Sequence, residues 1–328
     1  MKDLSGNGLT ESAHRMHYIL RFASAMCFIG HGAFGIITKP IWCNYFAVFG
    51  IGHDMAYTLM PVVGTIDITM GLILLFYPIR AVPAWLIIWG IATASLRPLS
   101  GEPFAELIER AGNFGAPLAL LLLAGAGGGR AGMATHGVGS TVTRGTSNAT
   151  GAEGDGAGTA TRGAGSTAGA GGGRAGTASR GAGMSKIRFW FSRLNPNPQP
   201  DARTFSRVAL CLRIVAFLLL LGHGWLNLIE KKGLLQQYTN LGFSNPANTA
   251  LVAGLFEILA ALAILIRPVR PLLIALFIWK MGTELFYPKY EIFEWVERGG
   301  SYGALLALYF TLGKSRVQET SSQHKLAI

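Results

Sequence analysis

Two histidines inside apolar stretches are the residues of this sequence best suited to chemistry. His31 and His223 each stand between two glycines, in Gly-His-Gly segments that lie 192 residues apart. A neutral imidazole donates a hydrogen bond from one ring nitrogen and accepts one at the other, and the glycines allow a neighbouring helix or a flat ligand to come close. Such a ring can pair with a carboxylate, bind the head group of a ligand or pass a proton.

Each histidine is followed by an acidic residue and a tryptophan in later apolar stretches. The two sets of candidate cofactor-binding residues are His31, Asp67 and Trp89, and His223, Glu257 and Trp279. With a helical rise of about 1.5 Å per residue, the three side chains of each set fall in one inner layer of a membrane. A carboxylate near the middle of a span costs about 2.5–3.5 kcal/mol, so each acidic residue requires a reason for its position.

These sets allow more than one interpretation. The histidine and the carboxylate of one set can simply satisfy each other, which lets both stay buried. Alternatively, each set forms a site for a quinone or a similar head group, or part of a proton or substrate pathway. Haem ligation by His31 and His223 together is disfavoured, because the sequence has neither a second histidine pair nor an attachment motif.

The cysteines offer no further chemistry. Cys27, Cys43 and Cys211 form no CxxC pair, and we interpret them as small apolar filler. We therefore expect no metal site, and no residue can be assigned a catalytic role from the sequence.

The two histidine sets belong to a duplication that runs through most of the chain. Leu20-Arg21 corresponds to Leu212-Arg213, and the register continues with small slips to the ends of both copies. Other matched positions are Lys39 with Lys231, Gly64 with Gly254, Trp89 with Trp279, Pro98 with Pro288, and residues 108–115 with residues 296–303. So many ordered coincidences predict two copies of one fold in tandem.

The composition indicates a membrane protein. Of the 328 residues, 50% are hydrophobic and 14% are charged, which leaves too few polar side chains to cover a soluble protein of this size. Spans are expected at 18–38, 55–77, 81–96, 112–124, 208–229, 249–266, 271–285 and 300–312. Because each copy then holds an even number of spans, both copies enter the membrane from the same side. The predicted fold class is an all-α integral membrane protein of two parallel-repeat four-helix bundles, with eight transmembrane helices.

The predicted domain order includes a long low-complexity linker between the two bundles. Because this linker is almost entirely Gly, Ala, Ser and Thr, it cannot bury a core, and we interpret it as a flexible tether. A basic and aromatic segment follows it, with a pattern typical of a stretch that lies on a membrane surface. The order is an N-terminal tail at 1–16, the first bundle at 17–124, the linker at 125–184, the interfacial segment at 185–203, the second bundle at 204–313 and a C-terminal tail at 314–328.

The net charge of +11 is concentrated on one side of the predicted membrane. That side holds both termini and the linker, so the excess of Lys and Arg predicts that it is cytoplasmic. The basic balance needs no nucleic-acid partner. The expected location is the cytoplasmic membrane of a bacterium, with the lipid bilayer as the first partner.

Three further charged positions recur in both copies. Arg21 and Arg213 lie one turn inside the cytoplasmic boundary, where snorkelling or a headgroup contact is expected. Glu109-Arg110 and Glu297-Arg298 open the last span of each copy at the opposite face. There the carboxylates suit a helix N-terminus and each arginine can pair locally; the alternative is an external surface for a substrate or partner.

The second copy resembles a known family of small membrane proteins. The residues that carry the resemblance are Leu212-Arg213, Gly222-His-Gly-Trp-Leu-Asn-Leu228, Glu257 and Arg267-Pro-Val-Arg270. This pattern is similar to the DoxX/DoxD-like family of four-helix membrane proteins. The first copy fits it too, with Ala33-Phe34-Gly35 in place of Trp-Leu-Asn and Asp67 in place of Glu. The family includes the membrane subunit of a thiosulfate:quinone oxidoreductase and members of redox-protective complexes, so the resemblance implies a quinone-linked or complex-forming role.

Two classes of function follow. One is a quinone-interacting subunit of a membrane oxidoreductase, whose other redox centres lie on membrane or peripheral partner subunits, since this sequence has neither a dinucleotide loop nor a metal-cluster motif. The alternative is a non-catalytic accessory subunit of a larger respiratory or photosynthetic complex. A small-molecule transporter is a third candidate.

Overall fold

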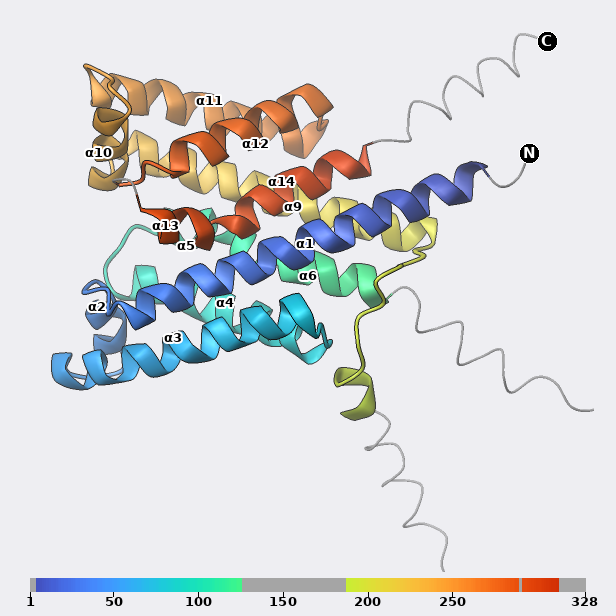
Figure 1. Ribbon diagram of the computed structural model, residues 1–328. Coiled ribbons are helices and arrows are strands. Elements are labelled where there is room, and N and C mark those ends of the chain that lie inside the picture. Colours follow the sequence, from blue (N-terminus) through green and yellow to red (C-terminus); the bar gives the residue numbers. More distant parts are fainter. Residues whose placement is uncertain (1–3, 126–186, 289–290, 313–328) are drawn as a thin grey trace, which may run out of the picture.

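The computed structural model describes residues 4–125, 187–288 and 291–312, and over these ranges the chain is helical and contains no strand. The longer helices run along one common direction (Figure 1). They are α1 (Leu4–Ile36), α3 (His53–Phe76), α4 (Ala81–Leu99), α6 (Ala111–Gly125), α9 (Ala202–Leu228), α11 (Pro246–Ile266), α12 (Arg270–Glu284) and α14 (Gly299–Thr311). The short helices are α2 (Trp42–Ala47), α5 (Ala105–Glu109), α10 (Lys232–Asn240) and α13 (Ile292–Glu297). Figure 1 places all four short helices at one end of the molecule, away from the N-terminus.

Local sequence explains where the helices of the second half begin and end. At the start of α9 the Asp201 side chain accepts a hydrogen bond from the backbone N–H of Thr204, at 2.8 Å. Asn245 caps α11 in the same way, and Pro246 follows at the first helical position, where the missing N–H costs nothing. Helix α11 ends before Pro268, as expected because the residue before a proline avoids the helical conformation.

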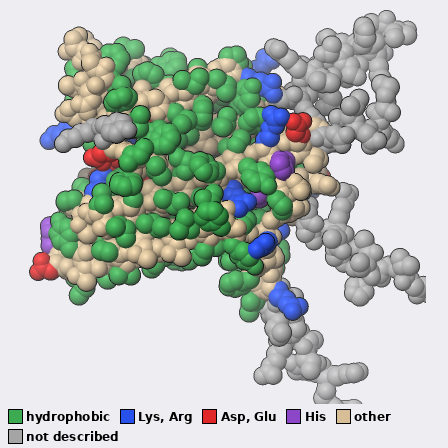
Figure 2. All heavy atoms as spheres, viewed as in Figure 1, with side chains coloured by type: hydrophobic (Ala, Val, Ile, Leu, Met, Phe, Trp, Pro, Cys, Tyr) green, Lys and Arg blue, Asp and Glu red, His purple; other side chains and the backbone are tan. Residues whose placement is uncertain are grey.

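Six helical stretches among the described residues are long and apolar enough to cross a membrane, and they indicate a polytopic membrane protein. They are Gly8–Ile36, His53–Phe76, Ala81–Leu99, Ala105–Gly125, Ala202–Leu228 and Pro246–Ile266. Figure 2 shows a broad hydrophobic face along the helix bodies, with charged side chains gathered mostly towards the two ends. The prediction of eight spans is not confirmed, because α12 and α14 have 15 and 13 residues and are shorter than a full crossing requires.

Helix α1 extends through most of the N-terminal tail predicted at 1–16, because it already begins at Leu4. The reason is packing. Ala13 and Met16 are fully buried in the main hydrophobic core, and the Arg15 guanidinium lies over the ring of Phe310 on α14. A polar stretch therefore continues as helix because one of its faces is covered by a distant helix.

The two halves of the chain share one core. Helix α1 packs on α13 and α14 as well as on α3, and α9 packs on α5 and α6 as well as on α11. The main cluster of buried residues accordingly draws on both halves, for example Leu20 and Leu120 from the first and Leu212 and Leu305 from the second. Each half therefore completes the packing of the other.

Glycines on α1 and α9 allow this close crossing. A Cβ atom added at Gly30 would fall on the backbone of Glu297, and one added at Gly222 would fall on the backbone of Glu109. A Cβ at Gly32 would lie 2.5 Å from the carbonyl oxygen of Gly64. The glycines around each histidine therefore bring neighbouring backbones into contact, as the sequence suggested.

The segment after the linker docks on the end of the first half. The backbone N–H of Leu194 donates to the carbonyl of Pro78 at 2.8 Å, and that of Arg80 donates to Ser192 at 3.1 Å. Several aromatic side chains of this segment are exposed, including Phe189. The linker beyond Gly125 and the C-terminal tail lie outside the described residues.

Candidate functional site

His31 on α1 and Asp67 on α3 form a hydrogen-bonded pair. Nδ1 of His31 lies 2.7 Å from Oδ2 of Asp67, whose side chain is almost completely buried. The indole of Trp42 on α2 packs over the imidazole, with ring centroids 4.7 Å apart. An ionised carboxylate can only accept, so Nδ1 carries the hydrogen and Nε2 is the ring nitrogen left for a ligand.

Two cavities meet at His31. One has a volume of about 40 Å³ and is polar; its donors are His31, Lys39, Arg97, Arg110 and Asn113, and its acceptors include Glu294 and Glu297. The other, of about 90 Å³, is apolar and aromatic; it is lined by His31, Trp42, Tyr45, Phe46, Phe49, Val63, Trp89, Thr93 and Leu96. The structure thus brings His31 and Trp89 to one cavity, with Asp67 directly behind the histidine. The Trp89 indole nitrogen is buried and has no hydrogen-bond partner among the described residues.

His223 on α9 and Glu257 on α11 form the corresponding pair, but it is closed off. Nδ1 of His223 lies 2.5 Å from Oε2 of Glu257. Asn227 donates to the same carboxylate at 3.3 Å and accepts from the hydroxyl of Tyr238 at 2.8 Å. The His223 side chain is 4% exposed, compared with 19% for His31. The imidazole of His223 is therefore enclosed by neighbouring side chains, whereas that of His31 is partly exposed.

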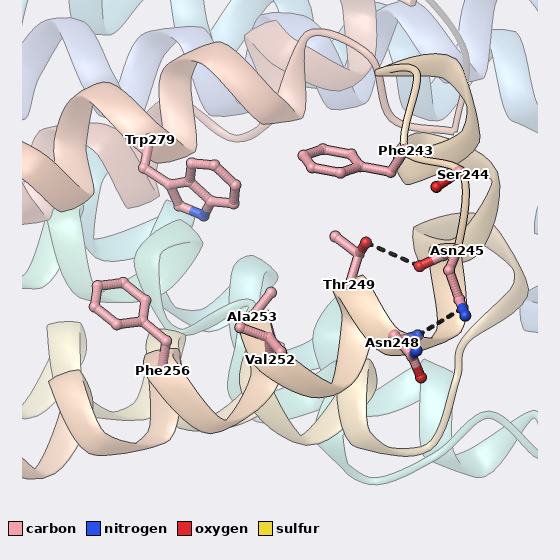
Figure 3. Close-up of a pocket in the computed structure, with 9 residues that line it drawn as sticks. All are labelled: Phe243, Ser244, Asn245, Asn248, Thr249, Val252, Ala253, Phe256 and Trp279. Atoms are coloured by element: carbon pink, nitrogen blue, oxygen red, sulfur yellow. Dashed lines mark hydrogen bonds between the residues drawn. The ribbon is translucent and has the colours of Figure 1, made fainter.

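Trp279 lies on a groove whose lining residues do not include His223. It lines an open groove of about 500 Å³ between α11 and α12 (Figure 3). The polar groups of this groove bond to one another, since Asn245 accepts from Asn248 N at 3.1 Å and from Thr249 Oγ1 at 2.9 Å. Although this groove is the larger space, it has no titratable side chain and suits a lipid chain better than a reacting ligand.

Sequence reasoning missed the charged pair Lys280 and Glu284 on α12. Lys280 Nζ lies 2.5 Å from Glu284 Oε1, and both side chains are buried. Glu284 also lies 3.1 Å from Nε of Arg298 and 3.4 Å from Nε2 of His223. The sequence did contain a signal for this pair. A lysine and a glutamate lie four residues apart inside a predicted span, and opposite charges at that spacing share one face of a helix.

The expectation that each Glu-Arg pair bonds locally is wrong. Arg110 pairs with Glu297 at 2.6 Å, and Arg298 pairs with Glu109, so both ion pairs join the two halves. The cause is close approach at the start of α6 and α14, where a Cβ at Gly300 would lie 2.5 Å from the carbonyl oxygen of Gly112. All four side chains are buried rather than external.

These pairs set the charge states near the site. Burial alone would raise the pKa of Glu297, which lies outside the six candidate spans, but the Arg110 guanidinium lowers it to about 2. Lys39 pairs with Glu294, and Lys231 pairs with Glu106, again across the two halves. The polar centre of the molecule is therefore a network of paired charges.

Arg21 and Arg213 have a role that the sequence did not reveal. Arg21 donates to the carbonyls of Leu74, at 2.9 Å, and Leu75, close to the end of α3. Arg213 donates to Ile264 at 3.1 Å and to Leu265 at 2.5 Å, close to the end of α11. The structure therefore replaces the expected headgroup contact by capping, because a helix C-terminus leaves carbonyls without partners and attracts cations.

Glu109, His223 and Glu284 offer ligand atoms within 4.8 Å of one another, the spacing that a metal ion requires. The two carboxylates are already bonded to Arg298 and Lys280. The positive charges of Arg298 and Lys280 thus already balance these two carboxylates, and we describe Glu109, His223 and Glu284 as part of the charge network.

The chain was compared with families, curated proteins and solved structures. No family model, curated protein or solved structure matches it.

Proposed function

We propose that the chain is a tandem pair of DoxX-like units with eight membrane crossings, in which α12 and α14 complete the second unit. Contacts at positions matched in the sequence support the duplication. Lys39 and Lys231 bind glutamates of the opposite half, and Arg21 and Arg213 cap equivalent helices. Helices of 15 and 13 residues reach only part of the way across a hydrocarbon core of about 30 Å, so the shorter two would rely on burial against their neighbours.

We further propose that the protein is a quinone-interacting subunit of a membrane oxidoreductase, with its quinone site at His31. One observation carries this proposal: the His31–Asp67 pair opens on an aromatic cavity, whereas the His223–Glu257 pair does not. A flat ring fits between aromatic side chains, and an imidazole can hydrogen-bond a carbonyl oxygen at the edge of that ring. Trp42, Phe46 and Trp89 would hold the ring.

A quinone supplies an acceptor of two electrons and two protons. In this site Asp67 holds the His31 ring in one orientation and tautomer, as a carboxylate does behind a catalytic histidine. Once it is protonated at Nε2 as well, His31 is placed to donate a hydrogen bond, and then that proton, to a carbonyl oxygen of the head group. Electrons would arrive from a partner subunit.

The proposal is tested by extracting quinone from the protein purified in mild detergent. We expect the wild-type protein to retain quinone and both His31→Gln and Asp67→Asn to lose most of it while they stay folded. The matched control is Trp279→Leu, which removes a tryptophan outside the His31 cavity and should leave the quinone content unchanged. Wild-type protein without quinone, in a host that makes it, would contradict the proposal.

The second candidate is an accessory subunit of a larger respiratory or photosynthetic complex. The closed His223 site favours it, because a histidine surrounded by Glu257, Asn227 and Glu284 is typical of a structural network. Deletion of the gene separates the two candidates. Loss of a large complex without loss of a quinone-linked activity would support the accessory role.

A further inference from the structure

The two histidine sites differ at two positions on the third long helix of each half. Trp89 and Thr93 on α4 correspond to Trp279 and Thr283 on α12, and in both helices the threonine hydroxyl donates to the carbonyl of the tryptophan. In this register Gly90 stands where the second half has Lys280. Ala94 likewise stands where it has Glu284.

In the second half, the Glu284 carboxylate fills the centre of the site. One of its oxygens lies 2.5 Å from Lys280 Nζ and 3.4 Å from His223 Nε2, and the other lies 3.1 Å from Arg298 Nε. The Glu284 carboxylate thus contacts both Nε2 of His223, the ring nitrogen that does not face Glu257, and the guanidinium of Arg298.

In the first half, the same groups lack that carboxylate. Nε of Arg110 is buried and makes no hydrogen bond among the described residues, and the same is true of Nε of its counterpart Arg298. Of the two, only Arg298 Nε has a carboxylate oxygen at ion-pair distance, at 3.1 Å. A second nitrogen of the Arg110 guanidinium, Nη1, donates a hydrogen bond to Glu297. The polar cavity of about 40 Å³ lies here, between Arg110, His31 and Asn113. A volume of about 10–15 Å³ is enough for one water molecule, so this space admits a small polar group.

We propose that the polar cavity binds the carboxylate of a small acid, which contacts Arg110 Nε and His31 Nε2 as the Glu284 side chain contacts their counterparts in the second half. Arginine and an imidazolium are strong donors to a carboxylate. The adjoining apolar cavity, which shares His31 and Trp42, accommodates a short hydrocarbon part of the acid.

Charge balance adds a second requirement. Glu284 comes with Lys280 as its counter-charge, but Gly90 supplies no cation in the first half. The charged groups around His31 are Asp67, Lys39, Arg97, Arg110, Glu294 and Glu297, and the cations among them already pair with glutamates. The acid therefore binds together with a proton, which His31 carries on Nε2.

This site does not depend on the quinone proposal, because it rests on the polar cavity and on Glu284. The two ligands would compete, since both contact His31 Nε2 and enter the same apolar cavity, but quinone content and acid binding are measured separately, so either proposal can fail alone.

The test uses the full-length protein in detergent, with acetate as the probe and acetamide as its neutral counterpart. Acetate should raise the unfolding temperature in proportion to the logarithm of its concentration, as a ligand of the folded state does, and acetamide should not. Calorimetry in two buffers of different ionisation enthalpy should show uptake of about one proton per acetate bound. Equal effects of acetate and acetamide, or binding without proton uptake, would overturn the proposal.

Two variants at Ala94, the counterpart of Glu284, are designed to extend a side chain towards the cavity from the neighbouring Thr93 position of α4. Ala94→Glu should lower acetate affinity by tenfold or more, an order of magnitude that a lost charge-assisted contact predicts. Ala94→Gln should block acetate as well, but the Glu variant should unfold at a higher temperature than the Gln variant because only a carboxylate satisfies Arg110. Unchanged acetate binding in both folded variants would place the acid elsewhere and reject the site.

The length of the acid distinguishes a soluble metabolite from a fatty acid. Affinity that rises from acetate to butyrate and then falls at octanoate supports a small soluble acid, as proposed. Affinity that keeps rising to octanoate and beyond would contradict the small-acid assignment and indicate a lipid carboxylate. A matched gain of function completes the test: Lys280→Gly with Glu284→Ala should add a second acetate site at His223.

Discussion

The ion pair between Arg110 and Glu297 gives a quantitative test of how the two halves are joined. The two side chains are 10% and 4% exposed, and their charged atoms lie 2.6 Å apart. Removal of one member of a buried pair leaves the other charge uncompensated, which typically costs about 3–5 kcal/mol. Since Arg97 and Arg298 still offset part of the Glu297 charge, we expect Arg110→Gln to fall at the lower end of this range and to lower the free energy of unfolding by about 3 kcal/mol.

The chain provides a control pair with the same geometry and different burial. Arg15 and Glu11 on α1 are also 2.6 Å apart, but their side chains are 55% and 65% exposed. An exposed pair four residues apart on a helix contributes about 0.3–0.5 kcal/mol. Because the N–O distance is the same in the two ion pairs, the difference between their coupling energies measures the effect of burial.

The assay is a double-mutant cycle, read from reversible unfolding of the purified protein by denaturing detergent. Glu297→Gln, Arg110→Gln and the double variant should give a coupling energy of about 1.5–3 kcal/mol, the range for hydrogen bonds to charged groups. The Glu11→Gln and Arg15→Gln cycle should give a small fraction of that. If the two cycles give the same coupling energy, the buried pair does not join the halves in the way described.

Three further predictions address the packing, the second histidine and the linker. Gly30→Ala should destabilise the fold by more than about 1 kcal/mol, because the new Cβ meets the backbone of α13, whereas Gly282→Ala, which meets open space, should be nearly neutral in the same unfolding assay. His223→Ala should cost less in the background of Glu257→Gln than alone, and strictly additive losses would show that the pair is not coupled. Two halves made by cutting the chain near Ser166 should assemble when co-expressed and co-purify, since α1 and α9 each pack on the opposite half; halves that insert but never associate would contradict this.

The helices and the two histidine pairs could be predicted from the sequence for simple reasons. Apolar runs of sufficient length define spans, and a carboxylate within such a run requires a partner, which directed attention to Asp67 and Glu257. The distances of His31 and Asp67 from their span ends placed them at a similar depth, and the structure brings them into contact. Whether either histidine holds a cofactor stays a prediction.

The partners of Glu109 and Glu297 could not be predicted from the sequence. Each has an arginine as its next neighbour, and helix geometry alone favours a local pair. The structure pairs each glutamate with the arginine of the other half, because the crossing of α6 and α14 brings backbones together at Gly112 and Gly300. Sequence periodicity within one helix carries no information about such a crossing.

The difference between the two sites was likewise hidden by the strength of the repeat. Matching Trp89 to Trp279 emphasised what the halves share, whereas the functional contrast lies at Ala94 and Glu284, where they differ. The last two predicted spans, 271–285 and 300–312, agree with α12 and α14 to within one residue at each end, but helices of 15 and 13 residues are short for a full crossing.

The central claim is that the first half holds an open ligand site and the second half does not. Photoaffinity labelling of the purified protein with an azidoquinone, followed by peptide mapping, tests it most directly. We expect labelling in residues 42–49 and 89–96 and none in residues 243–256. The label should be lost in Trp89→Leu but not in Trp279→Leu. Labelling confined to 243–256, or equal labelling of both halves, would contradict it.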